Sequence, residues 1–595
     1  MKILAIYPTH NANVGVFVDG KCEGIYHEEK FSNKKHHLGW PHRALKYISG
    51  IYSINEIDYI TITSEQQYYY PDDRYIDDVI KEQNTYKGRL LEWAKNIYYL
   101  LWYVLGNYKI FSDVFKYYLH NIATPNAKKQ MELTLEKEYG IKKEKIKYIE
   151  HHLAHALTTH YFYGLGQLKK DILYITMDGL GDDYFSRIYH YHSNEDNFEM
   201  IAQSPFSASL GLLYTEITRF LGMKPNEHEY KVMGLAAYVN NCKYYNHIYR
   251  MLEKYFWLDK NTLTFKSKVN TFISIQYLLR KILVGERFDN ISAAVQKFIE
   301  DKVIEYIKTV IDKTGIKNVA LSGGVFMNVK LNKKISEMED IEKVYFQPSS
   351  GDDSSVIGCA AKIFRENNIE LIPVKTMYLG HSYSNSEVGD FLERYEDKYC
   401  IDYFENSNDL YEKITDLLKN FEIVALHRGR GEWGARSLCN RTILGNASDL
   451  KTFHEVNDMI KMRDFWMPFA PTILFHWADK YIKNWDMLKN KIYDSSKYMI
   501  LGFDSTELAQ KHLRAAIHQK DKTLRPQILE EKDNPDIFNI FKLYEKKTGM
   551  GGMMNTSLNI HGYPLAGTLE QSFDTFINSG LKYIALENYL ISKKT

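Results

Sequence analysis

Two histidines four positions apart are the side chains of this 595-residue chain best placed to share a metal ion. His151 and His155 would project from one face of a helix. Asp352 follows a predicted strand and could be a third ligand or a helix N-cap. Two imidazoles and one carboxylate suit iron, manganese or zinc and leave coordination positions open for a substrate. Taken alone, each of these motifs more commonly has a structural role.

Two glycine-containing turns follow buried-type strands and suit a phosphate or a nucleotide. Glycines let backbone N–H groups approach a phosphate, an aspartate can hold a metal ion, and an amide can bond ribose hydroxyls. The residues concerned are Asp178, Gly179 and Gly181 in the first turn, and Gly323, Gly324 and Asn328 in and after the second. Taken alone, the first motif is usually only a turn, and the second is equally compatible with a tight strand–helix connection.

Arginines and lysines of the C-terminal region are mixed with glycine and small hydroxyl residues. Residues 427–441 read HRGRGEWGARSLCNR, a composition that suits a backbone folded around a ligand better than an exposed helix face. Arginine forks and hydroxyls together suit a compact dianion such as a phosphate. The candidate residues are Arg436, Lys461, Arg463, Arg525, Asn555 and Ser557.

The elements that must position these groups alternate between strands and helices, which predicts an α/β fold. A strand, a loop and a returning strand occur twice, about 170 residues apart, which indicates a duplicated unit. Strands are expected over 2–8, 13–21 and 22–29, and again over 171–179 and 184–192, with strand–loop–helix segments over 318–335 and 344–364. Loops at the carboxyl ends of such strands are where α/β proteins bind ligands.

A stretch with proline and glycine over 371–384 predicts a domain boundary. We therefore expect a first domain over 1–370 and a second α/β domain over 375–595. Within the first, 66–147 is expected to be a helical insertion. Its aromatic residues could stack on sugar faces or pack together: Tyr68, Tyr69, Tyr70, Trp93 and Trp102.

Composition excludes several classes of protein. Lys+Arg total 76 and Asp+Glu 75, a balance that disfavours a protein wrapping nucleic acid by phosphate neutralisation. Five scattered cysteines without a Cys-x-x-Cys pair indicate reduced thiols and a cytoplasmic location. The most apolar window, 97–105, is about half the ~20 residues that a membrane span needs. It is expected to be a buried helix, with a dimer interface or a membrane surface as alternatives.

The order of these motifs along the chain resembles the O-carbamoyltransferase family, typified by NodU and by antibiotic carbamoyltransferases. The resemblance rests on the HHLAHA motif at 151–156, the segment 28–36, the motifs at 209–214 and 229–236, the glycine and Gly-Asp turns at 323–328 and 351–352, and the segments 429–441 and 555–564. Eight motifs in register outweigh the structural reading of any one.

The resemblance implies two domains with successive tasks. The first would be TsaD-like, with a duplicated actin/sugar-kinase-like fold, and the second YrdC-like. The second would use carbamoyl phosphate and ATP to form carbamoyl-adenylate, releasing phosphate and pyrophosphate. The first would carry the metal, expected to be iron(II), and pass the carbamoyl group to a hydroxyl of a sugar, nucleotide-sugar or natural-product acceptor. The carbamoyl-adenylate would reach it by an enclosed route that keeps water out.

By the same resemblance, each candidate residue receives a role. His151, His155 and Asp352 would hold the metal. The nucleotide would contact Asp178, Gly179, Gly181, Glu229, Lys231, Gly323, Gly324 and Asn328. The reacting groups would meet His10, Lys35, His36, Arg436, Lys461, Arg463, Arg525, Asn555 and Ser557. His10 is the candidate general base, since a neutral imidazole can accept the acceptor's proton.

The chain departs from the family pattern at a few positions. Met467 stands where an arginine is common, so Arg463 or Arg430 would have to compensate, or carbamoyl phosphate would be held more weakly. Asn11 and Tyr563 replace a common aspartate and glutamate.

Two other functions remain open at this point. One is threonylcarbamoyl transfer to tRNA by the same domain types, which tight, salt-dependent tRNA binding would support. The other is a non-catalytic nucleotide- or sugar-binding regulator, which nucleotide binding without turnover would support. We expect no nucleic-acid partner and no membrane span, and allow for a homodimer.

Overall fold

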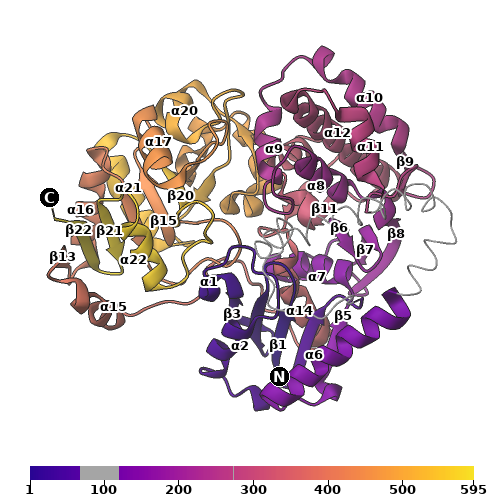
Figure 1. The fold of residues 1–595 in the computed structure, drawn as a ribbon, viewed down its shortest axis with the longest axis horizontal. Helices are drawn as coiled ribbons and strands as arrows, with labels where there is room; N and C mark the ends of the chain where they lie inside the picture. Colours follow the sequence, from indigo (N-terminus) through magenta and orange to yellow (C-terminus); the bar gives the residue numbers. More distant parts are fainter. Residues whose placement is uncertain (67–118, 273, 595) are drawn as a thin grey trace, which may run out of the picture. The chain divides into compact units, whose positions relative to one another are not determined.

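The computed structural model describes residues 1–66, 119–272 and 274–594 (Figure 1). They form two compact units: Met1–Glu23 with His36–Lys375, and Gly24–Lys35 with Thr376–Thr595. This division differs from the expected one by the segment Gly24–Lys35. The aromatic residues of the expected insertion, from Tyr68 to Trp102, lie outside the described residues. Among those described, no helix has the length and apolar character needed to cross a bilayer.

The first unit contains the same five-stranded sheet twice. The strands are β1 (Lys2–Tyr7), β2 (Asn13–Val18), β3 (Lys21–His27), β4 (Tyr59–Thr63) and β5 (Ile146–Ile149), then β6 (Ile172–Gly181), β7 (Tyr184–His192), β8 (Asn197–Pro205), β11 (Asn318–Ser322) and β12 (Lys343–Phe346). Their orders are β3-β2-β1-β4-β5 and β8-β7-β6-β11-β12. In each sheet the first strand pairs antiparallel with the second and parallel with the fourth. The expected α/β fold and its duplication are thus confirmed.

Several strand ends differ from the prediction, and one of them marks the start of a helix. The third expected strand, 22–29, ends at His27, because Glu28 and Glu29 begin the short helix α1 (Glu28–Ser32). Two acidic side chains in the first turn favour a helix start, since the N-terminus of a helix carries partial positive charge.

Two helices of the first unit meet at very short range. α7 (His151–Tyr163) packs against β6 and β11, and α14 (Ser355–Glu366) packs against β1 and β4. A Cβ added at Gly358 would lie 1.8 Å from the carbonyl oxygen of Ala154, so only glycine permits this approach. The Thr158 hydroxyl accepts a hydrogen bond from the Gly358 N–H at 3.0 Å. This crossing fixes the helix that carries both histidines.

We therefore expect Gly358→Ala to destabilise the protein by about 1–3 kcal/mol, as other insertions of a methyl group into a packed core do. Denaturant unfolding would measure the change. Gly50→Ala is the matched control, because Gly50 has an ordinary φ of −77° and its nearest neighbour would be 3.4 Å from the new Cβ. Equal stability of both variants would show that the crossing can relax.

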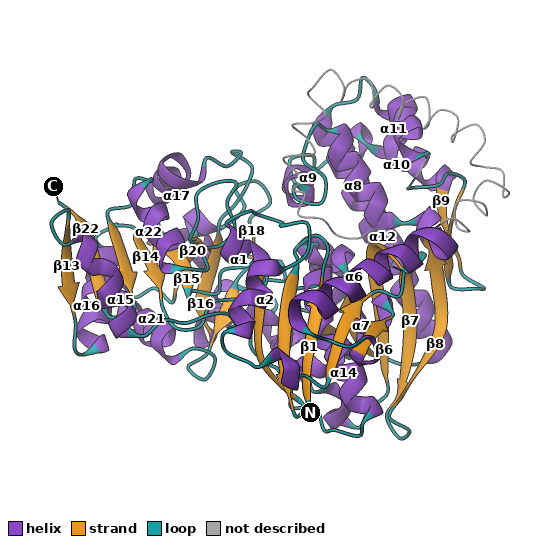
Figure 2. Cartoon of the chain, turned by 60° about the horizontal axis from the view of Figure 1, so that its bottom comes forward, coloured by secondary structure: helices purple, strands orange, loops and turns teal. Residues whose placement is uncertain are grey.

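The second unit is built on one eight-stranded mixed sheet, drawn in orange in Figure 2. Its order is β13-β22-β21-β14-β15-β20-β16-β19. The strands are β13 (Tyr399–Tyr403), β14 (Val424–His427), β15 (Arg441–Gly445), β16 (Ala470–Leu474), β19 (Gln527–Leu529), β20 (Gly552–Ser557), β21 (Tyr583–Leu586) and β22 (Tyr589–Lys593). This confirms the expected α/β character of the C-terminal region.

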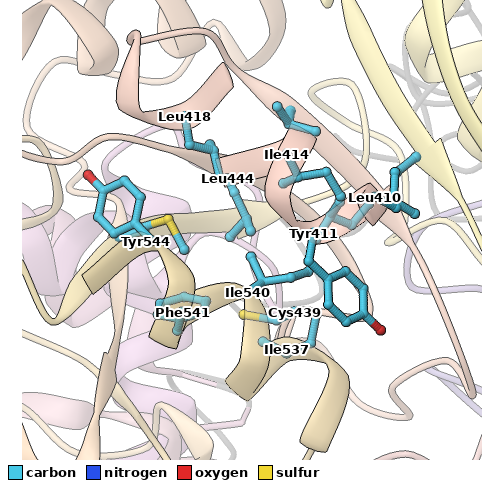
Figure 3. Packing of buried hydrophobic residues seen from close by; sticks show 14 of the residues in the cluster. Leu410, Tyr411, Ile414, Leu418, Cys439, Leu444, Ile537, Ile540, Phe541 and Tyr544 are labelled. Carbon is cyan, nitrogen blue, oxygen red and sulfur yellow. The ribbon is translucent and has the colours of Figure 1, made fainter. Parts of the chain in front are cut away.

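The core of the second unit lies between two amphipathic helices and the sheet (Figure 3). Leu410, Ile414 and Leu418 are four apart on α16 (Ser407–Lys419), so they line one face. They pack in one cluster with residues of α21 (Pro535–Thr548) and with sheet residues such as Leu444. This core supports the strands and loops that carry the arginines.

Candidate functional site

Four side chains that can bind a metal meet in the first unit. One ligand atom from each of His151, His155, Asp178 and Asp352 lies within 4.8 Å of the others. The Nε2 atom of His155 is 3.3 Å from an Asp178 carboxylate oxygen and 3.2 Å from one of Asp352. The Nε2 atom of His151 is 3.6 Å from Asp352 and 3.9 Å from Asp178.

These separations fit a metal ion. Ligand atoms at about 2.1 Å from a tetrahedral ion are roughly 3.4 Å from one another. His151 Nε2 is buried and has no hydrogen-bond partner among the described residues, although an unpaired buried polar atom costs free energy. The set of two imidazoles and two carboxylates is one that iron, zinc or manganese accepts.

The electrostatics of the cluster also favour a cation. Burial opposes charge on His151, His155 and Asp178. Nevertheless Asp178 and Asp352 raise the pKa of His155 to about 10, and the two imidazoles hold the pKa of Asp178 well below its ordinary range. The two carboxylates thus draw positive charge to this point, which a dication can supply in place of protons.

Each ligand is positioned by the element that the sequence pattern predicted. Glu150 caps α7 by accepting hydrogen bonds from the N–H groups of His152 and Leu153 at 2.9 and 2.7 Å. Asp178 lies near the end of β6, and Asp352 follows β12. Asp352 is not the N-cap of α14, since that helix begins after Ser354, so the capping interpretation is wrong.

Tyr7 is a member of this site that the sequence did not reveal. Its hydroxyl donates a hydrogen bond to Asp352 at 2.6 Å and lies 3.3 Å from Nδ1 of His10. The Nε2 atom of His10 is 3.5 Å from Asp352, and the His10 side chain is 42% exposed. His10 therefore stands at the solvent-facing rim of the cluster. Tyr7 ends a strand whose pattern is simply apolar, so nothing in the sequence marked it.

Tyr7→Phe should weaken metal binding about 10–100-fold, because partners that orient a ligating carboxylate have effects of that size. Titration of the metal-free protein with iron(II) or zinc would measure it. Tyr161→Phe is the control, since the hydroxyl of that buried tyrosine donates to the Gly20 carbonyl instead of to a carboxylate of the cluster. Unchanged affinity in Tyr7→Phe would exclude the orienting role.

The predicted glycine turns serve Asp178 directly. The N–H of Gly179 donates to one Asp178 oxygen at 2.6 Å, and the N–H of Gly324 donates to the other at 3.0 Å. Gly323 has a φ of +99°, and a Cβ there would meet the Met177 carbonyl oxygen at 2.2 Å. A Cβ at Gly181 would meet the His151 ring at 2.1 Å. Residues 178–181 belong to strand β6, so the first predicted turn is wrong. Both glycine segments nevertheless hold a metal-site carboxylate.

The other predicted nucleotide contacts lie in two further helices or at their ends. The Asn328 side chain caps α13 (Val329–Ser336) and bonds to Gln296 at 2.9 Å. Glu229 accepts a hydrogen bond from the Asn226 N–H at 2.7 Å. Glu229 and Lys231 both lie in α9 (Glu229–Ala236). Their proposed contact with a nucleotide stays a prediction.

The second unit brings several positively charged side chains close together. Lys461 is 1% exposed, and its ammonium donates to oxygens of Ser557 and Asn559. Burial, Arg463 and Lys35 hold the pKa of Lys461 well below its ordinary range. Burial, Arg436 and Arg463 likewise lower the pKa of Arg525.

This group of Lys35, Arg436, Lys461, Arg463 and Arg525 is called the cation cluster below. Among the described residues, no carboxylate pairs with Lys461 or Arg525. Like charges close together and partly buried are unfavourable unless an anion neutralises them. The cation cluster is therefore suited to bind an anion.

The remaining predicted residues of this region have other positions. Asn555 is satisfied by a buried network that includes Thr442 at 2.7 Å and Thr472 at 2.9 Å. Arg430 donates to the backbone carbonyls of Leu379 and Gly380. Arg463, in contrast, belongs to the cation cluster. Of the two arginines, Arg463 is therefore the one placed to supply the positive charge that Met467 lacks.

The adjacent residues Lys35 and His36 belong to different units. Lys35 contributes to the cation cluster, as its effect on Lys461 shows. His36 lies in the first unit, where its Nδ1 is 2.6 Å from the Asn11 side-chain oxygen. The pattern that placed both in one predicted set could not separate them.

A cavity of about 490 Å³ lies in the first unit. Its lining includes Glu65, Lys128 and Tyr148, and the Lys128 ammonium lies 4.2 Å from the centre of the Tyr148 ring. Asp182 joins this cavity to the cluster. Its carboxylate accepts hydrogen bonds from the N–H groups of Glu65 at 3.0 Å and His151 at 2.8 Å.

Comparisons with known proteins cover nearly the whole chain. Residues 2–361 match the model of the carbamoyltransferase N-terminus, and residues 415–593 match that of the carbamoyltransferase C-terminus. An uncharacterized protein of Methanocaldococcus jannaschii, MJ1058, is 30% identical over 100% of both chains. The 3'-hydroxymethylcephem-O-carbamoyltransferase of Amycolatopsis lactamdurans is 25% identical over 41% of this chain and 42% of its own. A crystal structure of full-length HypF covers 61% of this chain and 55% of its own, with 12% identity and a TM-score of 0.29.

Proposed function

The chain belongs to the carbamoyltransferase family, and on this premise we propose that it is an ATP-dependent O-carbamoyltransferase. Water would cleave carbamoyl phosphate to carbamate and phosphate. The carbamate oxygen would then attack the α-phosphorus of ATP, forming carbamoyl-adenylate and releasing pyrophosphate. The carbamoyl group would then pass to a hydroxyl of a small acceptor, with release of AMP. The cephem relative is named for transfer to a hydroxymethyl group, which supports a hydroxyl acceptor.

The observation that carries the proposal is the coexistence of a metal-binding cluster and an anion-binding cluster in one chain of this family. His151, His155, Asp178 and Asp352 would hold the metal, for which we propose iron(II). When bound, the metal would act as a Lewis acid toward phosphate oxygens. Tyr7 would orient Asp352 by the hydrogen bond from its hydroxyl.

The cation cluster would bind the phosphate of carbamoyl phosphate and later the phosphates of ATP. Lys461 would be held in place by its contacts with Ser557 and Asn559, while Arg525 would offer its fork to the anion. Binding of an anion would relieve repulsion among these cations. Donors held ready in this way need no reorganisation as charge develops on the oxygens.

His10 would be the general base for the acceptor hydroxyl. The Tyr7 hydroxyl gives its proton to Asp352, so Nδ1–H of His10 can donate to the Tyr7 oxygen. Nε2 then carries the lone pair that accepts a proton. Because the side chain is 42% exposed, the proton can afterwards pass to water.

The cavity lined by Glu65, Lys128 and Tyr148 would receive the acceptor. Its size and its mixed lining of charged and aromatic side chains suit a polyhydroxylated molecule such as a sugar or nucleotide sugar. Asp182 would fix the position of Glu65 in the cavity wall relative to His151, through its hydrogen bonds to the N–H groups of both residues.

Incubation with ATP, carbamoyl phosphate, iron(II) and a panel of sugars and nucleotide sugars tests the proposal. Mass spectrometry should find one acceptor gaining a carbamoyl group, and Lys128→Ala should raise its KM. ATP binding without turnover across the panel would favour a non-catalytic regulator. Tight, salt-dependent binding of tRNA would favour threonylcarbamoyl transfer instead.

A further inference from the structure

A second group of metal-binding side chains lies on the sheet of the duplicated half. His190 and His192 are on β7, Asp171 directly precedes β6, and Glu199 is on β8. Asp171 and Asp178 are at opposite ends of the same strand, roughly 20 Å apart at about 3.3 Å per residue. The group is therefore separate from the site proposed above.

Strand register brings the four residues to one face of the sheet. His190 and His192 are two apart, so their side chains share a face. Glu199 is directly opposite His190 across the β7–β8 pair. Ile172 pairs with Tyr191, so Asp171, one residue earlier, continues this register opposite His192.

The side chains converge on this face, and each histidine contacts the carboxylate diagonal to it rather than the one directly opposite. Nε2 of His190 is 3.0 Å from an Asp171 oxygen, and Nε2 of His192 is 2.9 Å from a Glu199 oxygen. The two imidazole centres are 3.8 Å apart. One ligand atom each from Asp171, His190 and His192 lies within 4.8 Å of the others.

One carboxylate is already oriented. Oδ1 of Asp171 accepts hydrogen bonds from both the N–H and the hydroxyl of Ser193 at 2.9 Å, which leaves Oδ2 facing His190. Such outer hydrogen bonds are what fix ligands in protein metal sites. The ammonium of neighbouring Lys170 pairs with Glu342.

We propose that Asp171, His190, His192 and Glu199 form a second divalent-metal site, of the zinc or copper(II) class. Two imidazoles and two carboxylates are a ligand set that these ions accept. The ligands are partly exposed, so the metal can exchange with solvent. Because its ligands come from three neighbouring segments of one sheet, a bound ion would join them and stabilise the folded state.

Zinc titration of the metal-free protein against a chromophoric chelator tests this proposal. Wild type should bind two equivalents of zinc. The double variant His190→Gln/His192→Gln should keep the buried equivalent, and its affinity for the surface equivalent should fall at least about 10-fold. His155→Ala should also bind one, through the surface ligands. If the buried cluster bound no zinc, wild type and His155→Ala should each bind one equivalent and the double variant none. That result would still support the surface site. Two equivalents with unchanged affinity in the double variant would overturn it.

A matched variant and two further measurements separate metal binding from folding. His247→Gln removes another exposed histidine–carboxylate pair, in which His247 is 2.8 Å from Glu286, and should keep two equivalents. Zinc should raise the thermal midpoint of His155→Ala but not that of His155→Ala with both surface substitutions. Copper(II) bound to His155→Ala should show couplings to two nitrogens in its electron paramagnetic resonance spectrum. No couplings to imidazole nitrogen would contradict the assignment.

Discussion

His155→Ala should abolish carbamoyl transfer to the acceptor. His155 lies closest to both carboxylates of the metal cluster, at 3.2 and 3.3 Å, and is fully buried. Its loss removes one of the four metal ligands. It also removes the imidazole that lies between the carboxylates of Asp178 and Asp352. We expect the rate of transfer to fall at least about 10²-fold, the scale on which losing one electrostatic stabiliser acts.

The control for His155→Ala is His160→Ala on the same helix. His160 is also buried, but its imidazole bonds to the Tyr174 hydroxyl at 2.7 Å and belongs to an aromatic cluster. Its replacement should lower stability and leave the transfer rate of the folded protein near wild type. If both variants lost transfer equally, folding rather than metal binding would explain the effect.

Arg525→Met should raise the KM for carbamoyl phosphate by about 10–150-fold, since hydrogen bonds to charged groups contribute about 1.5–3 kcal/mol. Arg525 is the arginine whose pKa is lowered by burial and by two neighbouring arginines, and it has no carboxylate partner among the described residues. Kinetics at varied carbamoyl phosphate would measure the change.

The same substitution should raise the stability of the anion-free protein, because it removes one of several crowded positive charges. A merely structural arginine would show the opposite, a loss of both stability and activity. Arg514→Ala is the control, as Arg514 is exposed in the same unit and should affect neither. An unchanged KM in Arg525→Met would remove this residue from the anion site.

The sequence predicted the parts of the fold that depend on local pattern. The spacing of His151 and His155 required a helix to bring them together, and their rings are 4.7 Å apart on α7. The repeated strand, loop and returning strand predicted two like sheets, and both have the same strand order. The family resemblance drawn from the motifs is confirmed by the two matching family models.

Features that depend on long-range contacts were not predictable. Asp178 reads as a turn residue, and only the pairing of β6 with β11 brings it beside Gly324 and the histidines. The segment Gly24–Lys35 belongs to the second unit through contacts such as the bond from the Lys30 ammonium to the Leu565 carbonyl. A local hydrophobic pattern carries no information about a contact between residues more than 500 positions apart in the sequence.

The central claim is that the two units perform successive half-reactions, and pyrophosphate release tests it most directly. With ATP and carbamoyl phosphate but no acceptor, wild type and His155→Ala should both release pyrophosphate, whereas Arg525→Met should do so only at high carbamoyl phosphate. When the acceptor is added, wild type should form the carbamoylated product and His155→Ala should not. Loss of pyrophosphate release in folded His155→Ala, or its persistence without carbamoyl phosphate, would contradict the account.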